Sequence, residues 1–151
     1  MALRNIVKDG DPILLKTSRP VEKFDARLWM LLDDMKETMY AANGVGLAAV
    51  QVGILRRVVV MDCGDGYLEL INPEITVREG EQFAEEGCLS FPGQSGVTCR
   101  PAVVQVKAQD RNGKWCVYKG TELKARCFCH EFDHLDGIVF TSRVIKKEPV
   151  T

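Results

Sequence analysis

The sequence predicts an α+β fold, in which mainly antiparallel strands surround a central helix and a further helix lies near the N-terminus. Two segments, one early and one late in the chain, repeat apolar residues at helical spacing. Between them lie short β-prone runs separated by Gly, Asp, Asn and Pro. No internal repeat or linker divides the 151 residues, so we expect a single domain over residues 1–151.

The first predicted helix covers residues 25–42. Its apolar residues follow the spacing i, i+3, i+4, i+7 and i+11 and therefore share one face: Leu28, Leu31, Leu32, Met35 and Met39. Asp25 is a suitable N-cap, because its carboxylate can accept a hydrogen bond from a free N–H of the first turn. Gly44 is the expected stop signal.

Strands are predicted at residues 57–61, 67–71, 75–77, 103–107 and 115–118. The last two form a predicted hairpin joined through Asp110-Arg111-Asn112-Gly113. Asn-Gly is typical of a type I′ turn, in which both central residues have positive φ, so we expect that turn here.

The second predicted helix, residues 122–136 with Gly137 as the residue that ends it, carries the only two histidines. His130 and His134 are four residues apart and project from one helical face, so they can bind one metal ion together. Glu131 can then take a proton from a water that the metal activates. An amphipathic helix with two surface or core histidines is the alternative.

A catalytic metal site needs a third ligand and an open position. Because the histidines are exhausted, that ligand is Cys, Asp or Glu. Cys88 is the candidate, since Gly87 beside it allows close approach of the backbone. Cys127, three residues before His130, stays open as an alternative. One thiolate and two imidazoles suit Fe²⁺, Zn²⁺, Co²⁺ or Ni²⁺.

Composition excludes several other classes of protein. Twenty basic and twenty-one acidic side chains give a net charge of −1, so no global basic field indicates nucleic acid or an anionic membrane as the main partner, and the pair Lys146-Lys147 is too short to change that. No apolar stretch approaches the roughly 20 residues of a membrane span. The N-terminus has no signal-peptide core, so we expect a cytoplasmic protein with six reduced cysteines.

Three stretches together resemble the motifs of the peptide deformylase family, in the family's order: Gly44–Gln51 (GVGLAAVQ), Glu86–Ser90 (EGCLS) and His130–His134 (HEFDH). The resemblance runs from about Arg4 to about Phe140. The glycines of the first stretch also fit a loose dinucleotide-binding fingerprint, but that motif requires a strand before it and a helix after it. Here a helix precedes and a strand follows, which leaves a purely structural turn as the other interpretation.

The resemblance implies a metal-dependent hydrolase that removes the formyl group from N-formylmethionyl nascent peptides and releases formate. Cys88, His130 and His134 would be the metal ligands. Glu131 would be the general base that later delivers the proton to the leaving amine. The side chain of Gln51 and the backbone N–H of Leu89 would stabilise the oxyanion.

The same resemblance implies the substrate contacts. Backbone groups of Val45 and Gly46 would pair with the main chain of the peptide as an added strand. The remaining predicted substrate-binding residues line the methionine pocket or its rim: Val45, Glu86, Gly87, Leu123, Cys127 and His130. Asp133 and Arg100 would orient neighbouring side chains.

Fe²⁺ is the metal that the resemblance implies, with Zn²⁺, Ni²⁺ or Co²⁺ able to substitute, in a monomer. Val50 and Cys129 depart from the residues that the family has more often at these places. The chain ends soon after Phe140 without the longer C-terminal helix with which some relatives dock on ribosomes, so at most transient contact with the ribosome is expected. A zinc peptidase that cleaves internal peptide bonds and a catalytically silent metal-binding relative are the competing functions.

Overall fold

The computed structural model describes residues 2–145, so Lys146 and Lys147 lie outside the described residues. Two α-helices, seven strands and three 3-10 helices form in this range: η1 (Pro12–Leu15), α1 (Ala26–Ala41), β1 (Gly46–Ala48), η2 (Ala49–Val52), β2 (Val58–Asp62), β3 (Tyr67–Glu79), β4 (Gln82–Gly87), β5 (Ser95–Arg100), β6 (Val103–Gln109), β7 (Trp115–Thr121), α2 (Glu122–Leu135) and η3 (Phe140–Arg143). Over this part of the chain, no helix is long and apolar enough to cross a bilayer.

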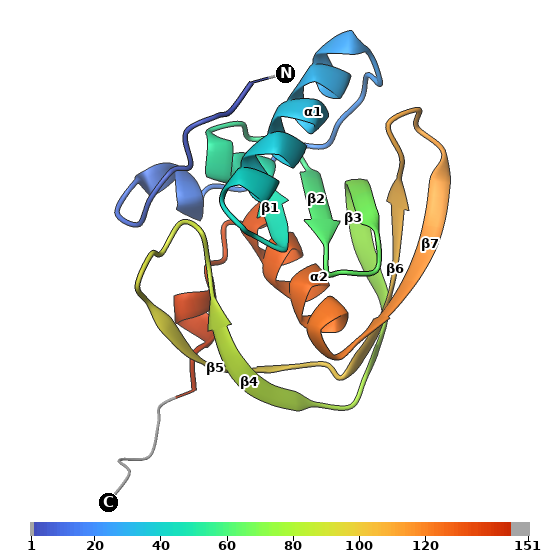
Figure 1. Ribbon diagram of the computed structural model, residues 1–151. Coiled ribbons are helices and arrows are strands. Elements are labelled where there is room, and N and C mark those ends of the chain that lie inside the picture. Colours follow the sequence, from blue (N-terminus) through green and yellow to red (C-terminus); the bar gives the residue numbers. More distant parts are fainter. Residues whose placement is uncertain (1, 146–151) are drawn as a thin grey trace, which may run out of the picture.

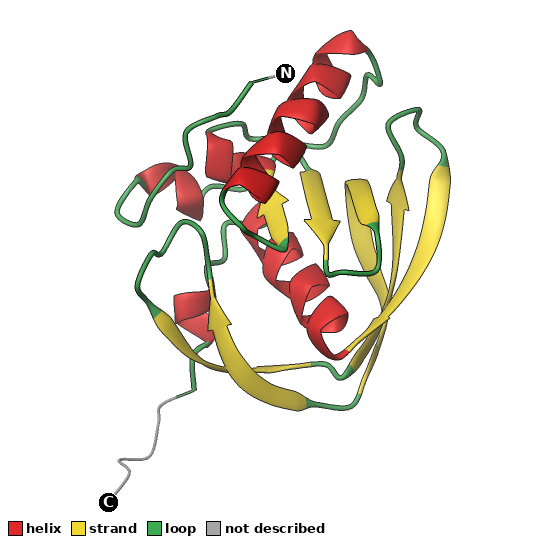
Figure 2. Ribbon diagram, viewed as in Figure 1, coloured by secondary structure: helices red, strands yellow, loops and turns green. Residues whose placement is uncertain are grey.

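Helix α2 lies between two antiparallel sheets (Figures 1 and 2). The larger sheet has the strand order β1-β2-β3-β6-β7, and the smaller one pairs β4 with β5. The larger sheet curves around α2, and α1 covers its other face near β1 and β2 (Figure 1). The predicted α+β fold with a central histidine-bearing helix is therefore confirmed, although β1, β4 and β5 were not predicted.

Strand β2 is apolar on both faces because a helix packs against each of them. Val58 and Val60 belong to the cluster around α1. Val59 and Met61 belong to the cluster around α2, together with Phe128 and other residues of that helix. Alternate side chains of a strand point to opposite faces, so a strand between two helices reads as a continuous apolar run. This packing fixes β1, the neighbouring edge strand, beside α2.

Both ends of α1 have standard caps, but the residue that ends the helix lies one position before the predicted one. The Asp25 carboxylate accepts a hydrogen bond from the Leu28 N–H at 3.2 Å, which confirms the predicted N-cap. At the other end Asn43, with φ of 56°, takes the left-handed conformation. The Gly44 N–H then donates to the Met39 carbonyl at 3.0 Å, as in a Schellman motif. Asn43 rather than Gly44 thus ends the helix.

Two predicted strands, residues 67–71 and 75–77, are parts of the single strand β3. The pairing register shifts between Ile71 and Glu74, so the strand continues through Pro73 by way of an irregularity in its pairing with β6. Asn72 has φ of 51° at this point. Its side chain accepts from the Val21 N–H at 2.8 Å and donates to the Val21 carbonyl at 2.9 Å, which stabilises the bend.

The predicted type I′ turn between β6 and β7 is wrong. Gly113 has φ of 85°, but Asn112 is not among the described residues with positive φ. The Asp110 carboxylate instead accepts the N–H groups of Asn112 at 2.8 Å and Lys114 at 3.0 Å. A side chain that bonds its own following backbone closes the loop without the second positive φ.

Gly137 ends α2 as predicted, with φ of 74°, and a Cβ there would lie 2.5 Å from the Leu15 carbonyl oxygen. We expect Gly137→Ala to lower the free energy of unfolding by more than Gly53→Ala. Gly53 also has positive φ, of 83°, but its surroundings are open. The control should therefore lose only the conformational penalty of about 1–2 kcal/mol. Urea unfolding of both metal-loaded variants measures the difference, and equal losses would contradict the steric role of Gly137.

Candidate metal centre

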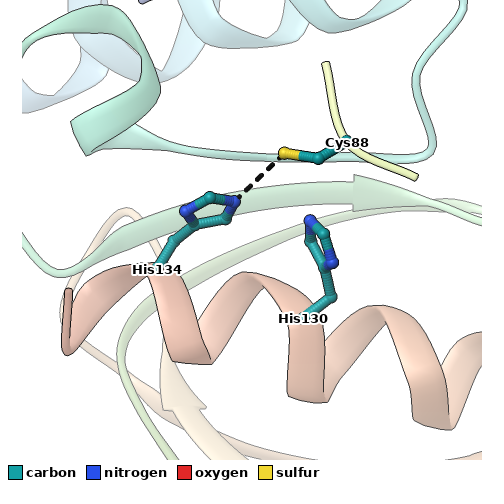
Figure 3. Close-up of side chains that lie close together, drawn as sticks. All are labelled: Cys88, His130 and His134. Carbon is teal, nitrogen blue, oxygen red and sulfur yellow. Dashed lines mark hydrogen bonds between the residues drawn. The ribbon is translucent and has the colours of Figure 1, made fainter. Parts of the chain in front are cut away.

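Three potential metal ligands converge from two layers of the fold. Cys88 follows β4, whereas His130 and His134 lie one turn apart on α2. Their ligand atoms all lie within 4.8 Å of one another, and the Cys88 Sγ is 3.3 Å from the His134 Nε2. Figure 3 shows the two imidazoles projecting from α2 toward the cysteine. Among residues 2–145 this is the one such cluster found, which favours Cys88 over Cys127 as the third ligand.

The chemistry of this group fits a divalent transition metal with one coordination position left open. Burial, and secondarily the charge of His130, lowers the pKa of His134 to about 3, so its imidazole is a neutral ligand. Burial also opposes charge on His130, but the charge interaction with Glu131 and the hydrogen bonds with Cys88 and Glu86 outweigh it and raise the pKa of His130 to about 10. The surroundings of His130 therefore stabilise positive charge, which favours a bound cation.

A buried carboxylate, Glu86, orients His130. The His130 Nδ1 lies 2.5 Å from the Glu86 Oε2. Burial alone would raise the pKa of Glu86, but hydrogen bonds from His130 and Arg100 hold it far below its usual range. The carboxylate is therefore the acceptor and Nδ1 the donor. Consequently the Nε2 of His130 is the atom left to bind a metal, as in carboxylate–histidine–metal arrangements.

Further hydrogen bonds tie Glu86 to both β5 and α2. Its oxygens accept from Thr98 Oγ1 at 2.8 Å, from Arg100 at 3.1 and 2.7 Å, and from Arg126 Nη1 at 2.9 Å. Arg100 also donates to Asp133 at 2.7 Å. Glu86, Arg100 and Arg126 are at most 5% exposed, so two guanidinium groups and two carboxylates balance one another around the centre. The sequence prediction that Asp133 and Arg100 orient neighbours agrees with these contacts.

Glu131 packs against the backbone of β1. A Cβ at Gly46 would lie 2.6 Å from the Glu131 Oε2, so the glycine makes room for the carboxylate. The other oxygen, Oε1, is buried and has no hydrogen-bond partner among the described residues. Burial, assisted by the charge of Glu86 and opposed by His130 and Arg100, raises the pKa of Glu131 to about 7. A carboxyl group with this pKa can both take up and release a proton near neutral pH.

Two hydrogen-bond donors lie beside Cys88. Gln51 is held from η2, because its Oε1 accepts the Ala48 N–H at 2.9 Å. Its Nε2 points to the Ser90 Oγ at 3.1 Å and the Cys88 Sγ at 3.4 Å. The Leu89 N–H follows Cys88 directly, and within the described range no acceptor for it is found. A group bound next to Cys88 can thus meet both donors.

A cavity of about 360 Å³ opens onto this site. Eleven of the twelve predicted site residues line it: Val45, Gly46, Gln51, Glu86, Gly87, Cys88, Leu89, Leu123, Cys127, His130 and Glu131. The twelfth, His134, is fully buried. Four other residues line the cavity without having been predicted: Asn43, Gly44, Glu85 and Arg126. Arg126 could have been found, because it lies four residues before His130 and shares its helical face.

The cavity runs along the open edge of the larger sheet. β1 is the terminal strand and pairs only with β2. The Val45 carbonyl accepts the Asp62 N–H at 2.9 Å, toward β2. Because successive residues of an antiparallel strand direct their backbone groups to opposite sides, the N–H and carbonyl of Gly46 face the open edge. An extended peptide could pair with them.

We expect Glu86→Gln to weaken metal affinity about 10–100-fold, because the neutral amide no longer orients His130 or balances Arg100 and Arg126. Glu81→Gln, at an exposed residue just before β4, is the matched control and should bind metal like the original chain. Competition with a chelator measures both affinities, and circular dichroism reports folding. Unchanged affinity in a folded Glu86→Gln protein would refute the positioning role of Glu86.

Comparison with known proteins agrees with this geometry. Residues 3–150 match the family model described as polypeptide deformylase. A peptide deformylase of Alkaliphilus metalliredigens is 58% identical over 147 residues, covering 97% of this chain and 100% of the relative. One of Acetivibrio thermocellus is 60% identical over 146 residues, covering 97% and 86%. The crystal structure of peptide deformylase from Thermotoga maritima superposes with a TM-score of 0.93 at 43% identity, covering 95% of this chain and 99% of that one. The chain therefore belongs to the polypeptide deformylase family.

Proposed function

We propose that this chain hydrolyses the formyl group of N-formylmethionyl nascent peptides and releases formate. The observation that carries the proposal is the meeting of a Cys-His-His centre with Glu131, Gln51 and the backbone N–H of Leu89 in one cavity at an open strand edge. A zinc peptidase would use the two histidines and the glutamate of α2, but it gives no role to Cys88 or Gln51. Their positions in the cavity favour deformylation.

The substrate would bind as a strand added to β1. Its main chain would pair with the outward-facing groups of Gly46, and this pairing is independent of sequence, as nascent chains require. The first side chain would enter the apolar part of the cavity beside Val45, Leu123 and Cys127. The formyl group would then lie next to Cys88, where the ligands and donors converge.

Cys88, His130 and His134 would hold the metal, which supplies Lewis-acid polarisation of the formyl carbonyl and activation of water. Glu131 would accept the proton of the attacking water on its unpartnered oxygen. It would return that proton to the peptide nitrogen as the carbon–nitrogen bond breaks. Its raised pKa, about 7, suits both transfers.

Gln51 and Leu89 would stabilise the negative charge that develops on the formyl oxygen. The Gln51 Nε2 is held in place by the bond that its Oε1 makes to the backbone of Ala48, so little reorganisation is needed. The Leu89 N–H has a fixed direction because it belongs to the backbone next to a ligand. Glu86, which the family resemblance places at the methionine pocket, would act chiefly through His130.

We further propose Fe²⁺ as the resident metal, with Zn²⁺, Ni²⁺ or Co²⁺ able to replace it, because one thiolate and two imidazoles accept all four. The proposed setting is a monomer in the cytoplasm that meets nascent chains transiently at the ribosome. The family to which the chain belongs supports this setting.

The decisive assay is formate release from a short formyl-Met peptide by protein prepared anaerobically with Fe²⁺, and by the Ni²⁺ and Co²⁺ forms. Glu131→Ala should keep the metal but lose turnover, because no other group takes the proton. Cys88→Ala should lose the metal. Absence of turnover in every metal form, or cleavage of internal bonds in an acetylated peptide, would refute the proposal. A fully active Glu131→Ala variant would refute the assigned base.

We expect Gln51→Ala to lower kcat about 10²–10³-fold with little change in KM, since the lost hydrogen bond forms mainly in the transition state. Ser90→Ala is the matched control, because it removes the hydroxyl that Gln51 contacts and leaves the amide donor in place. Steady-state kinetics at equal metal content compares the two. Equal losses in both variants would show that Gln51 has no oxyanion role.

A further inference from the structure

A second cavity, of about 670 Å³, lies against the first half of α1 and shares no lining residue with the cavity of the metal centre. Figure 1 shows that this half of α1 is the end farther from β1. Its rim carries five basic side chains: Arg4, Arg19, Lys23, Arg27 and Arg56. Only two acidic side chains, Glu22 and Asp25, line it. The cavity therefore has a local excess of positive charge in a chain whose net charge is −1.

Most of this positive charge is not neutralised by the protein. Arg4 is the exception, since it pairs with Asp34 at 2.9 Å. For the side chains of Arg19, Lys23 and Arg27, no ion pair or hydrogen bond is found among residues 2–145. The guanidinium of Arg56 reaches only the carbonyl of Leu55, at 3.4 Å. Four exposed cations are thus available to a ligand.

The backbone holds two of these cations side by side. Arg19 and Arg56 form an isolated parallel bridge. The Arg19 N–H donates to the Leu55 carbonyl at 3.1 Å, and the Arg57 N–H donates to the Arg19 carbonyl at 2.9 Å. Like charges on paired, neighbouring backbone segments repel one another. The N-terminus of the 16-residue helix α1 adds partial positive charge, part of which the N-cap carboxylate of Asp25 offsets. An anion in this cavity would relieve the repulsion between Arg19 and Arg56.

The floor of the cavity is apolar and includes Leu28, Leu31 and Ile54. A surface that combines an apolar floor with several guanidinium groups suits a ligand that carries both phosphates and flat rings. Guanidinium planes stack on nucleobases and bind phosphate oxygens in pairs. The cations also come from three separate segments, so they would engage more than one phosphate.

We propose that this basic cavity is an RNA-binding surface. The choice of RNA among polyanions rests on the proposed function, because nascent peptides emerge from a particle rich in RNA. The surface would raise the local concentration of the enzyme near its substrates without touching the metal centre.

The test is fluorescence anisotropy of a labelled single-stranded RNA, titrated with the metal-loaded full chain at several salt concentrations. Binding should weaken linearly with the logarithm of salt. The double variant Arg19→Gln/Arg27→Gln should bind about tenfold more weakly or worse, and its salt slope should fall by about two. Arg78→Gln/Lys119→Gln is the matched control, because it removes two exposed cations from β3 and β7, and it should leave binding unchanged.

Deformylation of a short formyl-Met peptide, measured on the same samples, should be equal in all variants, so failure of this inference is separate from failure of the proposed function. Three results would overturn the RNA surface. One is absence of RNA binding by the original chain at low salt. Another is an equal loss in the control variant. The third is displacement of RNA by polyglutamate or inorganic phosphate at matched charge concentration, which would show a general anion site.

Discussion

The metal centre depends on the hydrogen bonds and ion pairs that the buried carboxylate of Glu86 makes. Cys88 belongs to the layer of β4 and β5, whereas both histidines belong to α2. Side-chain bonds join these layers, including those of Arg100 to Asp133 and of Arg126 to Thr98. Glu86 lies two residues before Cys88 and bonds directly to His130 and Arg126 on the helix. Placing a charge in the protein interior costs several kcal/mol unless partners compensate it. Arg100, Arg126 and His130 provide that compensation, so the two layers are held in one relative position.

This balanced group also explains why the centre can be rigid before a substrate arrives. Asp133 accepts from Arg100 and from Arg143 of η3, which connects α2 to the segment that follows it. Such hydrogen-bonded polar networks favour one arrangement, because a shift leaves a buried charge unpaired. Rigid ligands and donors need little reorganisation during a reaction, which is the main advantage of a preorganised site. Burying the charged side chains of this network therefore costs desolvation energy, but their hydrogen bonds hold the metal ligands and hydrogen-bond donors in defined positions.

Elements whose conformation depends on nearby residues could be predicted from the sequence, whereas elements that depend on residues distant in the sequence could not. Helix α1 was predictable because its apolar spacing and its N-cap are local signals, and the end of α2 because Gly137 is a local stop signal. β2 was predictable because helices on both faces require an apolar run. β4 and β5 were not, since the stretch QFAEEG has little apolar alternation and its inward residue, Glu86, is buried by charge partners from elsewhere. The predicted type I′ turn before β7 is wrong because Asp110, which lies outside the Asn-Gly pair, determines the conformation of the loop.

Some residues of the metal centre could likewise be predicted from local sequence, whereas others are brought together only by the fold. The residues of the basic cavity belong to the second group. The histidine pair and Glu131 are a local pattern, but spacing alone left Cys127 open, and only the fold brings Cys88 to the histidines. The cations Arg19, Arg27 and Arg56 are likewise far apart in sequence and become neighbours only through the fold. A net charge near zero excludes a strong field far from the molecule. Within a Debye length of about 8 Å, however, a ligand responds to the local arrangement of charge. The neutral composition is therefore compatible with both a balanced network inside the protein and an unbalanced cavity on its surface.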